Sequence, residues 1–376
     1  AEQKARRMIR LFSQTAESVV VTGCYAEVAG EQVSSLSDKI TLFTLLEKAS
    51  ILELPLHVKS ALDSGLTIQD AVSSFRKGDG SVFAFDPSSF SYHSRAYLKV
   101  QDGCDNSCGY CKTTIARGPS RWLEPEEAVK RVLKLEAEGF HEIMLTGVNL
   151  TNYDHSGEGI GGLMEKILAA SGPDIRFRLS SMEPDHVDDR LLEAIKDPRV
   201  QPHFHIPIQS ASDHVLQIVG RKYSISHVDY IIQKLREYKD DPFIACDVIA
   251  GLPGETEEDF QITYDFMKRN DFSAMHVFPY SPRPETPLYG SKLFVEERIR
   301  DERAEKLREL SKRQSRDYIA RQKGKMVEIL AEEEGAGTTG NFLKAKIVSR
   351  SGAEIKEGAL YKGTLTSVFP LSVSVD

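Results

Sequence analysis

The stretch from Lys99 to Gly118, KVQDGCDNSCGYCKTTIARG, places three cysteines within eight positions. Cys104, Cys108 and Cys111 come directly after a short β-rich run, and no fourth cysteine lies nearby. A structural zinc site normally uses four Cys or His ligands at regular spacing, and no such histidine accompanies these three. Three thiolates suit a [4Fe–4S] cluster in which one iron is left without a protein ligand. The spacing therefore favours an iron–sulfur cluster, with zinc as the alternative.

The same order of elements repeats along the chain from residue 96 onward, with short β-rich runs separated by amphipathic helical stretches. The six runs are 96–100, 141–147, 175–181, 203–209, 243–252 and 273–281. Alternation of strand and helix implies parallel strands, and six strands are too few for a standard eight-stranded barrel. We predict a partial, open (β/α)6 barrel, with a doubly wound open sheet as the alternative. The cysteines then fall at the carboxyl end of a strand, where such barrels carry their chemistry.

Two smaller units are expected to flank this barrel. SVVVTGCYAEVAG (18–30) predicts a buried strand, a Gly-Cys turn and a helix start within an N-terminal α/β domain. After a long charged helix, the apolar period changes to two from Met326, which predicts a small antiparallel β-barrel. The predicted domains are residues 1–93, 94–318 and 319–376. Because the chain starts inside a helical pattern without an initiator methionine, we expect the N-terminal domain to be truncated.

Composition restricts the class of protein further. The 376 residues carry a net charge of −8, with 40% hydrophobic and 28% charged residues, as in ordinary globular proteins. No apolar run approaches a membrane span, and no signal peptide is visible. Five cysteines in a chain of this length do not make a disulfide scaffold. We therefore expect a reducing, cytoplasmic setting without a membrane partner.

The segment CDNSCGYC resembles the CxxxCxxC signature of the radical S-adenosylmethionine (SAM) enzymes, including an aromatic residue, Tyr110, before the last cysteine. The resemblance implies that Cys104, Cys108 and Cys111 ligate a catalytic [4Fe–4S] cluster. In that family the amino and carboxylate groups of SAM chelate the fourth iron. One electron from the cluster then cleaves SAM to a 5′-deoxyadenosyl radical. On this resemblance the iron that lacks a protein ligand is the binding position of SAM.

Further segments resemble one subfamily, the methylthiotransferases. They are VTGCYAE, IARGPSR, RLSSMEP, HIPIQSASDHVL, DVIAGLPGETEEDF and FPYSPRPETP. The subfamily combines an N-terminal domain that holds an auxiliary [4Fe–4S] cluster, a radical SAM barrel and a C-terminal RNA-binding β-barrel called TRAM. The resemblance makes Cys24 a ligand of the auxiliary cluster, although the other two ligands have no counterpart in this sequence. Taken alone, Cys24 reads as a buried thiol, and Cys246 within a β run is expected in the core.

The segment LTGVNL (145–150) resembles the bacterial enzymes that methylthiolate C2 of N6-threonylcarbamoyladenosine at position 37 of tRNA. This resemblance implies that SAM serves both as the radical source and as the methyl donor. The implied partners are SAM, a tRNA anticodon stem-loop and a reductase or flavodoxin-type electron donor. Three alternatives stay open: an enzyme acting on isopentenyladenosine in tRNA, one acting on a ribosomal protein, and an RNA-binding protein with a vestigial cluster.

A SAM site needs convergent polar groups at strand ends. The expected cofactor-binding residues are Tyr110, Gly147, Asn149, Ser180, Glu183, Gln209, Arg221 and Asp247. Glu183 suits a ribose hydroxyl and Arg221 suits the methionine carboxylate; the alternative for each polar residue is a solvated loop or a helix cap. Ser212 and Thr256 read as helix N-caps. For His203 and His205, polar lining of the barrel interior is favoured over metal ligation.

Overall fold

The computed structural model describes residues 2–75, 78, 80–84 and 94–375. The chain forms two compact units, one of residues Ala1–Asp86 with Lys112–Pro119 and one of Pro87–Cys111 with Ser120–Asp376. Residue 93, the predicted end of the N-terminal domain, lies outside the described residues. Within the described part of the chain, no helix combines the length and apolarity needed to cross a bilayer.

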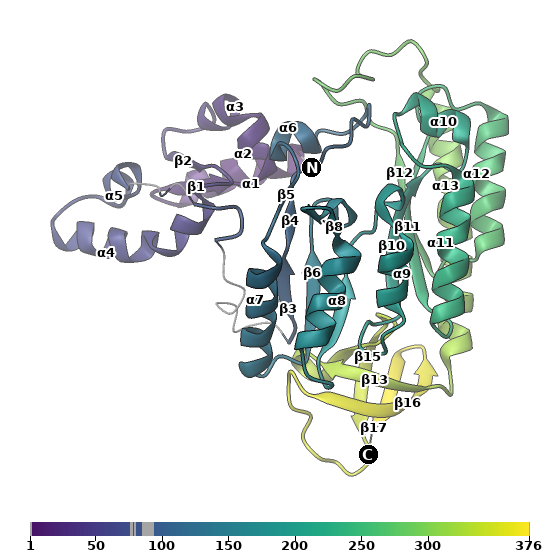
Figure 1. Cartoon of the computed structure of the whole chain (residues 1–376). Helices are drawn as coiled ribbons and strands as arrows, with labels where there is room; N and C mark the ends of the chain where they lie inside the picture. The colour runs from purple at the N-terminus through teal and green to yellow at the C-terminus, as the bar shows by residue number, and fades with distance from the viewer. Residues whose placement is uncertain (1, 76–77, 79, 85–93, 376) are drawn as a thin grey trace. The chain divides into compact units, whose positions relative to one another are not determined.

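The larger unit is built on six parallel strands (Figure 1). They are β3 (Ala96–Lys99), β6 (Glu142–Thr146), β9 (Arg176–Leu179), β10 (His203–Gln209), β11 (Phe243–Ala250) and β12 (Ala274–Pro279). The first three form one sheet and the last three another, and a parallel bridge between Ser181 and His205 joins them. The strands thus lie side by side in the order in which they occur along the chain. In a doubly wound sheet this strand order reverses at one point. The partial barrel is therefore confirmed.

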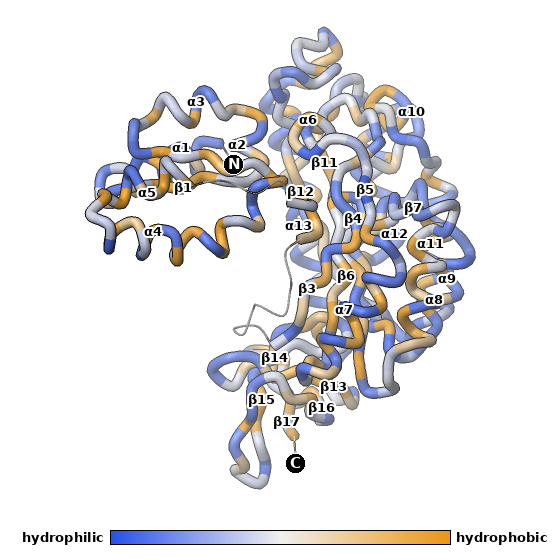
Figure 2. The backbone as a smooth tube through the Cα atoms, turned by 60° about the vertical axis from the view of Figure 1, so that its left-hand side comes forward, coloured by the Kyte–Doolittle hydropathy of each residue, from blue (hydrophilic) through white to orange (hydrophobic). Residues whose placement is uncertain are grey.

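Helices follow the strands of this barrel. They are α7 (Pro125–Ala137), α8 (Ile160–Ala170), α9 (Asp189–Ile195), α10 (Asp213–Ile218), α11 (Ile225–Tyr238), α12 (Glu257–Asn270) and α13 (Glu297–Gln322). Hydrophobic and hydrophilic bands alternate along the helices, as expected for elements with one buried face (Figure 2). The predicted N-caps are confirmed, because Ser212 accepts a hydrogen bond from Val215 N and Thr256 forms a capping box with Asp259.

Short elements complete the connections of the larger unit. They are β4 (Gln101–Asp102), β5 (Arg121–Trp122), η3 (Leu150–Asn152), β7 (Asp154–His155), β8 (Glu158–Gly159) and η4 (Pro184–His186). The pairing of β4 with β5 is antiparallel and brackets the cysteine loop, which begins at Gly103. This pairing fixes where the loop leaves the first barrel strand.

The C-terminal strands close into the expected small barrel. They are β13 (Met326–Ala331), β14 (Ala336–Thr339), β15 (Lys344–Ser349), β16 (Leu360–Val368) and β17 (Leu371–Val375), with η5 (Glu333–Gly335) between the first two. All pairs are antiparallel except β15 with β17, which is parallel. Ile329, Leu365 and Val373 fill its core together with Tyr318 from α13. The long helix therefore supplies part of the hydrophobic core of the terminal barrel.

The smaller unit contains the turn that the sequence predicted. Its elements are α1 (Glu2–Thr15), β1 (Val19–Thr22), α2 (Cys24–Val28), α3 (Gly30–Ser34), β2 (Ile40–Phe43), η1 (Lys48–Leu52), α4 (Leu54–Asp63), α5 (Ile68–Ser74) and α6 (Thr113–Arg117). Strands β1 and β2 are parallel. Gly23 has φ of 100°, a conformation that favours glycine, and so ends β1 and starts α2 at Cys24.

A buried group of charges ties the first sheet to the terminal barrel. Glu142 of β6 is fully buried and pairs with Arg95, Arg176 and Arg178. Arg178 Nη1 and Nη2 each donate at 2.8 Å to the carbonyl oxygens of residues 340 and 339 in the terminal barrel. Burial alone would raise the pKa of Glu142, but the guanidinium groups lower it to about 2. The carboxylate is therefore ionised in the folded protein at every pH above that value.

Replacing Glu142 with Gln is expected to lower the free energy of unfolding by about 3–5 kcal/mol, because buried guanidinium groups lose their counter-charge. In the wild type this stabilisation is present above the carboxyl's ordinary pKa of 4.5 and is lost as the pH falls towards about 2. Urea unfolding at pH 7 and at acidic pH measures both effects. The matched control is Glu328→Gln, whose carboxylate is 43% exposed and 3.8 Å from Arg176 Nη1; an equal loss there would contradict this account.

Candidate active site

The cysteine loop is held by backbone contacts to distant parts of the larger unit. Gly109 N donates to Val219 O at 2.9 Å, and Leu288 N donates to Gly109 O at 2.8 Å. A Cβ atom at Gly109 would lie 2.7 Å from Leu288 Cγ, so only glycine fits there. Within the loop, Cys111 N donates to Cys108 O at 3.0 Å. The three cysteines are thus presented on a loop whose shape is fixed from outside.

The thiols suit a polynuclear cluster better than a single metal ion. Among the described residues, the sulfurs of Cys104, Cys108 and Cys111 do not all meet within 4.8 Å. The ligands of one zinc ion would lie about 3.8 Å apart, given Zn–S bonds of about 2.3 Å. Burial raises the pKa of Cys104 and raises that of Cys108 to about 11, so both are protonated at neutral pH until a metal binds.

Gln101, which no sequence motif marks as functional, connects this loop to the end of β6. Its Nε2 donates at 2.8 Å to both Gly103 O and Ser120 Oγ, while its Oε1 accepts from Asn149 N at 2.9 Å. The side chain is fully buried. A Cβ at Gly147 would lie 2.8 Å from Gln101 Oε1. Gly147 therefore makes room for Gln101, and its predicted contact with SAM remains a prediction.

Asn149 contacts a predicted cluster ligand directly. Its Nδ2 donates to Cys104 Sγ at 3.6 Å, and Thr151 Oγ1 donates to Asn149 Oδ1 at 3.2 Å. Asn149 is only 2% exposed, so the amide is fixed in orientation. Hydrogen bonds to ligand sulfur are one means by which proteins set the reduction potential of iron–sulfur clusters. A cluster held by Cys104 would therefore accept a hydrogen bond from Asn149 at a ligand sulfur, and the predicted contact of Asn149 with SAM remains a prediction.

Glu183 and Arg221, predicted to contact different ends of SAM, form an ion pair with each other. Arg221 Nη1 donates to Glu183 Oε2 at 2.6 Å, and the Arg221 side chain is 4% exposed. Burial raises the pKa of Glu183 to about 7, although the guanidinium acts in the opposite direction. The Arg221 guanidinium also lies 5.9 Å from the ring centre of Tyr110. The pair thus forms one wall beside the cysteine loop.

Several buried polar atoms in this region lack hydrogen-bond partners among the described residues. They are Tyr110 OH, Ser180 Oγ and Arg221 Nε. Buried polar groups in folded proteins are normally hydrogen-bonded. A cofactor that brings its own hydroxyl, amino and carboxylate groups would satisfy them. Together with the three thiols, these atoms fit a [4Fe–4S] cluster that binds SAM.

The remaining predicted residues lie in different surroundings. Gln209 ends β10 with φ of 65°, a conformation uncommon outside glycine, and is buried. Asp247 lies in the middle of β11 and accepts hydrogen bonds from His205 and His276 rather than joining the Glu183 pair. In the smaller unit Cys24 is exposed, and Arg117 Nε donates to its sulfur at 3.2 Å. Cys24 is therefore not a buried thiol.

Comparison with known proteins agrees with the geometry. Residues 98–267 match the model of the Radical SAM superfamily. The solved structure of the cobalamin-dependent S-adenosylmethionine radical enzyme OxsB shares the fold, with a TM-score of 0.51 and 13% identity over 83% of this chain and 46% of that one. Fold and site thus define a radical SAM enzyme, which has a [4Fe–4S] cluster and uses SAM.

Relatives define the family within that class. The threonylcarbamoyladenosine tRNA methylthiotransferase MtaB of Treponema pallidum is 33% identical over 96% of this chain and 86% of its own length. MtaB of Thermotoga maritima is 34% identical over 88% and 75%. The tRNA-2-methylthio-N(6)-dimethylallyladenosine synthase of Bacillus subtilis is 32% identical over 71% and 54%. The chain belongs to the radical SAM methylthiotransferase family.

Replacing Asn149 with Leu is expected to make the reduction potential of the cluster more negative, because the reduced cluster loses a stabilising N–H···S bond. An anaerobic redox titration followed by electron paramagnetic resonance measures this potential. The control is Asn152→Leu in the same turn, whose Oδ1 accepts from Asp105 N at 3.4 Å. An unchanged potential in Asn149→Leu, with the iron content retained, would contradict the role of Asn149.

Proposed function

We propose that this enzyme methylthiolates C2 of N6-threonylcarbamoyladenosine at position 37 of tRNA. The main support is a set of five relatives named threonylcarbamoyladenosine tRNA methylthiotransferase, which are 32–34% identical over 87–96% of this chain. Three dimethylallyladenosine relatives are 31–32% identical over 71–89%. The segment LTGVNL at the end of β6 supports the same choice.

In this proposal Cys104, Cys108 and Cys111 hold the cluster, and the polar groups around them bind SAM. When bound, the cluster and SAM would supply radical chemistry for an adenine C–H bond that side-chain acids and bases cannot ionise. The chain's own residues position the reactants. Arg221 and Glu183 orient the charged and hydroxyl groups of SAM, while Ser180, Gln209 and Tyr110 complete its polar contacts.

The sulfur and the methyl group belong to the same proposal. Cys24 begins α2 on the surface of the smaller unit, beside the guanidinium of Arg117. Iron–sulfur clusters are held by cysteine thiolates. We assign Cys24 to an auxiliary [4Fe–4S] cluster that provides sulfur, with a second SAM providing the methyl group. A reductase or a flavodoxin-type electron donor in the cytoplasm would supply the electrons.

The terminal barrel is the proposed contact for the anticodon stem-loop. Along β15, Ala345 and Ile347 face the barrel core, while Lys344 and Lys346 are exposed. Lys362 on β16 is also exposed. Exposed lysines attract the phosphate backbone in a salt-dependent manner. The single-stranded anticodon loop leaves the modified base accessible to the barrel of the catalytic domain.

Mass spectrometry of tRNA nucleosides tests the proposed substrate. A strain that lacks the gene is expected to lose 2-methylthio-N6-threonylcarbamoyladenosine and to keep the unmethylthiolated nucleoside. The wild-type gene should restore the product, and a Cys108→Ala gene should not. Unchanged product in the deletion strain would reject this substrate. Loss of the 2-methylthio form of dimethylallyladenosine instead would assign the enzyme to the alternative tRNA substrate.

A further inference from the structure

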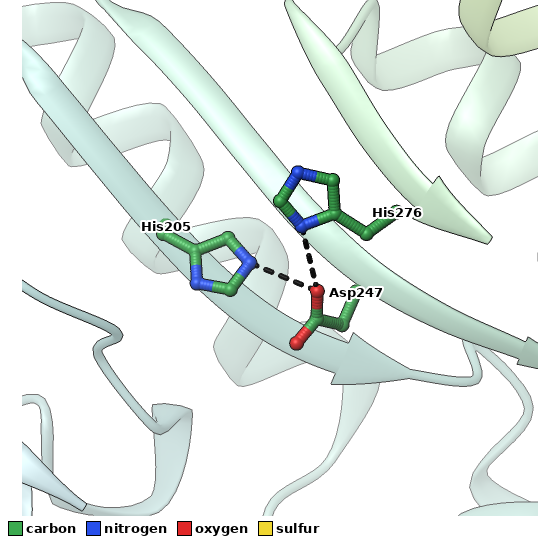
Figure 3. A group of neighbouring side chains, drawn as sticks. All are labelled: His205, Asp247 and His276. Carbon is green, nitrogen blue, oxygen red and sulfur yellow. Dashed lines mark hydrogen bonds and ion pairs between the residues drawn. The ribbon is translucent and has the colours of Figure 1, made fainter. Parts of the chain in front are cut away.

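A second polar group lies on the last three strands of the barrel and includes Asp247, one of the residues expected at the SAM site. His205 of β10, Asp247 of β11 and His276 of β12 point toward one another (Figure 3). His205 Nε2 lies 3.0 Å and His276 Nδ1 3.1 Å from the same oxygen, Asp247 Oδ1. The ligand atoms of all three residues lie within 4.8 Å of one another. We call these three residues the His–Asp–His cluster.

The cluster faces the interior of the barrel. The neighbouring Cys246 contacts Met267 of α12, at 3.8 Å between the sulfurs, so its side chain faces the helices. Because side chains alternate along a strand, Asp247 and Ile249 face the opposite side. Ile249 packs in one cluster with Tyr110 of the cysteine loop. Asp247 therefore lies about 6.6 Å along the inner face from Ile249, which packs against the same core residues as Tyr110 of the cysteine loop.

The hydrogen bonds fix where the protons are. Bonds to His205 and His276 lower the pKa of Asp247 against the opposing effect of burial, so its carboxylate only accepts. Both imidazole nitrogens that face Asp247 Oδ1 therefore carry protons. His205 Nδ1, 2.7 Å from Ser181 Oγ, then accepts from that hydroxyl when the ring is neutral. A metal ion would have to displace both protons, so the arrangement favours a hydrogen-bonding site over a metal site.

Two atoms of the cluster remain available to a ligand. Within the described part of the chain, neither Asp247 Oδ2 nor His276 Nε2 has a hydrogen-bond partner. The side chains are 23% and 58% exposed, so a ligand entering the barrel can reach them. His276 Nε2 accepts a hydrogen bond when the ring is neutral and donates one when it is protonated. Asp247 Oδ2 accepts from N–H or O–H groups.

We propose that the His–Asp–His cluster binds the polar N6 substituent of the target adenosine and selects a ureido-linked amino acid over an isoprenoid group. This inference rests on the proposed function. In adenine, C2 and C6 lie on either side of N1. A base whose C2 faces the cysteine loop therefore carries its N6 group away from that loop, toward the cluster. The N–H and hydroxyl groups of the substituent suit Asp247 Oδ2, and its carboxylate suits a protonated His276.

Discrimination follows from the cost of leaving these atoms unpaired. A dimethylallyl group offers neither donors nor acceptors, so its binding would bury Asp247 Oδ2 and His276 Nε2 without partners. Sites built to hydrogen-bond a substrate group reject an analogue lacking that group far more strongly than an apolar pocket rejects an extra methylene. The cluster thus provides a physical basis for choosing between the two nucleosides named among the relatives.

The test compares His276→Phe with wild type in the full-length, anaerobically reconstituted enzyme. The substrates are anticodon stem-loops that carry threonylcarbamoyladenosine or dimethylallyladenosine. We expect His276→Phe to raise KM for the threonylcarbamoyl stem-loop at least about tenfold. The ratio of kcat/KM for the threonylcarbamoyl stem-loop to kcat/KM for the dimethylallyl stem-loop should fall. SAM cleavage without RNA is measured in parallel, because His276 bonds to Asp247, one of the residues expected at the SAM site. A fall in SAM cleavage without RNA that equals the change with RNA would assign the cluster to SAM and overturn this inference. His276→Asn, which can still donate to Asp247, should recover part of the affinity.

The control is His214→Phe. His214 is 57% exposed, and its Nδ1 lies 3.1 Å from Asp259 Oδ2, so it matches His276 in exposure and bonding but lies on α10. The KM of His214→Phe for the threonylcarbamoyl stem-loop should equal that of the wild-type enzyme. If the wild-type enzyme is active and His276→Phe has an unchanged KM, this inference alone is overturned. The same follows if the wild-type enzyme binds one divalent metal ion per chain and both His276 variants lose it. A wild-type enzyme inactive on the threonylcarbamoyl stem-loop would overturn the proposed function and this inference with it.

Discussion

Three thiols can ligate only three of the four irons of a [4Fe–4S] cluster, and the proposed site depends on this constraint. The loop from Gly103 to Cys111 supplies the thiols and is fixed by contacts to Val219 and Leu288. Because those contacts are to the backbone of Gly109, they set the loop shape without occupying a metal site. Beside the loop, Tyr110 OH, Ser180 Oγ and Arg221 Nε have no hydrogen-bond partner among the described residues, and a nucleoside cofactor would supply such partners.

The strand order explains how these groups come together. Six parallel strands in sequence order bring all their carboxyl ends to one edge, so residues from distant segments converge there. Gln101 then couples the cysteine loop to the end of β6 through a single buried amide. At the other end of the strands, Glu142 and its arginines attach the terminal barrel. Gln101, which holds the cysteine loop, and Glu142, which attaches the terminal barrel, thus lie at opposite ends of the same sheet.

Local patterns were sufficient to predict the fold. Alternation of strand and helix gave the six strands, the change of period gave the terminal barrel, and Ser212 and Thr256 were recognisable as caps. Cys246 is buried in the core, as expected. Strand β14 cannot be recognised from its sequence, because AGTT has neither the apolar alternation nor the bulk of a typical strand. The parallel closure of β15 with β17 was also not predicted, since pairing partners leave no mark in the sequence of either strand.

The site was predictable only where its chemistry is local. Three cysteines within eight positions indicate a cluster, but the role of Gln101 depends on partners up to 48 residues away. The pairing of Arg221 with Glu183 and the meeting of His276 with Asp247 likewise arise from the barrel closing on itself. Polar residues at strand ends could be named as candidates. Which of them contact one another is determined by tertiary packing alone.

The central claim, an iron left open for SAM, is tested most directly by electron–nuclear double resonance on the reduced cluster. SAM labelled with ¹⁵N at its methionine amino group is added to full-length protein carrying Cys24→Ala, so that the cluster of Cys104, Cys108 and Cys111 is observed. The account predicts a hyperfine coupling between the cluster and the labelled nitrogen. A cluster that is present but shows no such coupling with bound SAM would contradict it.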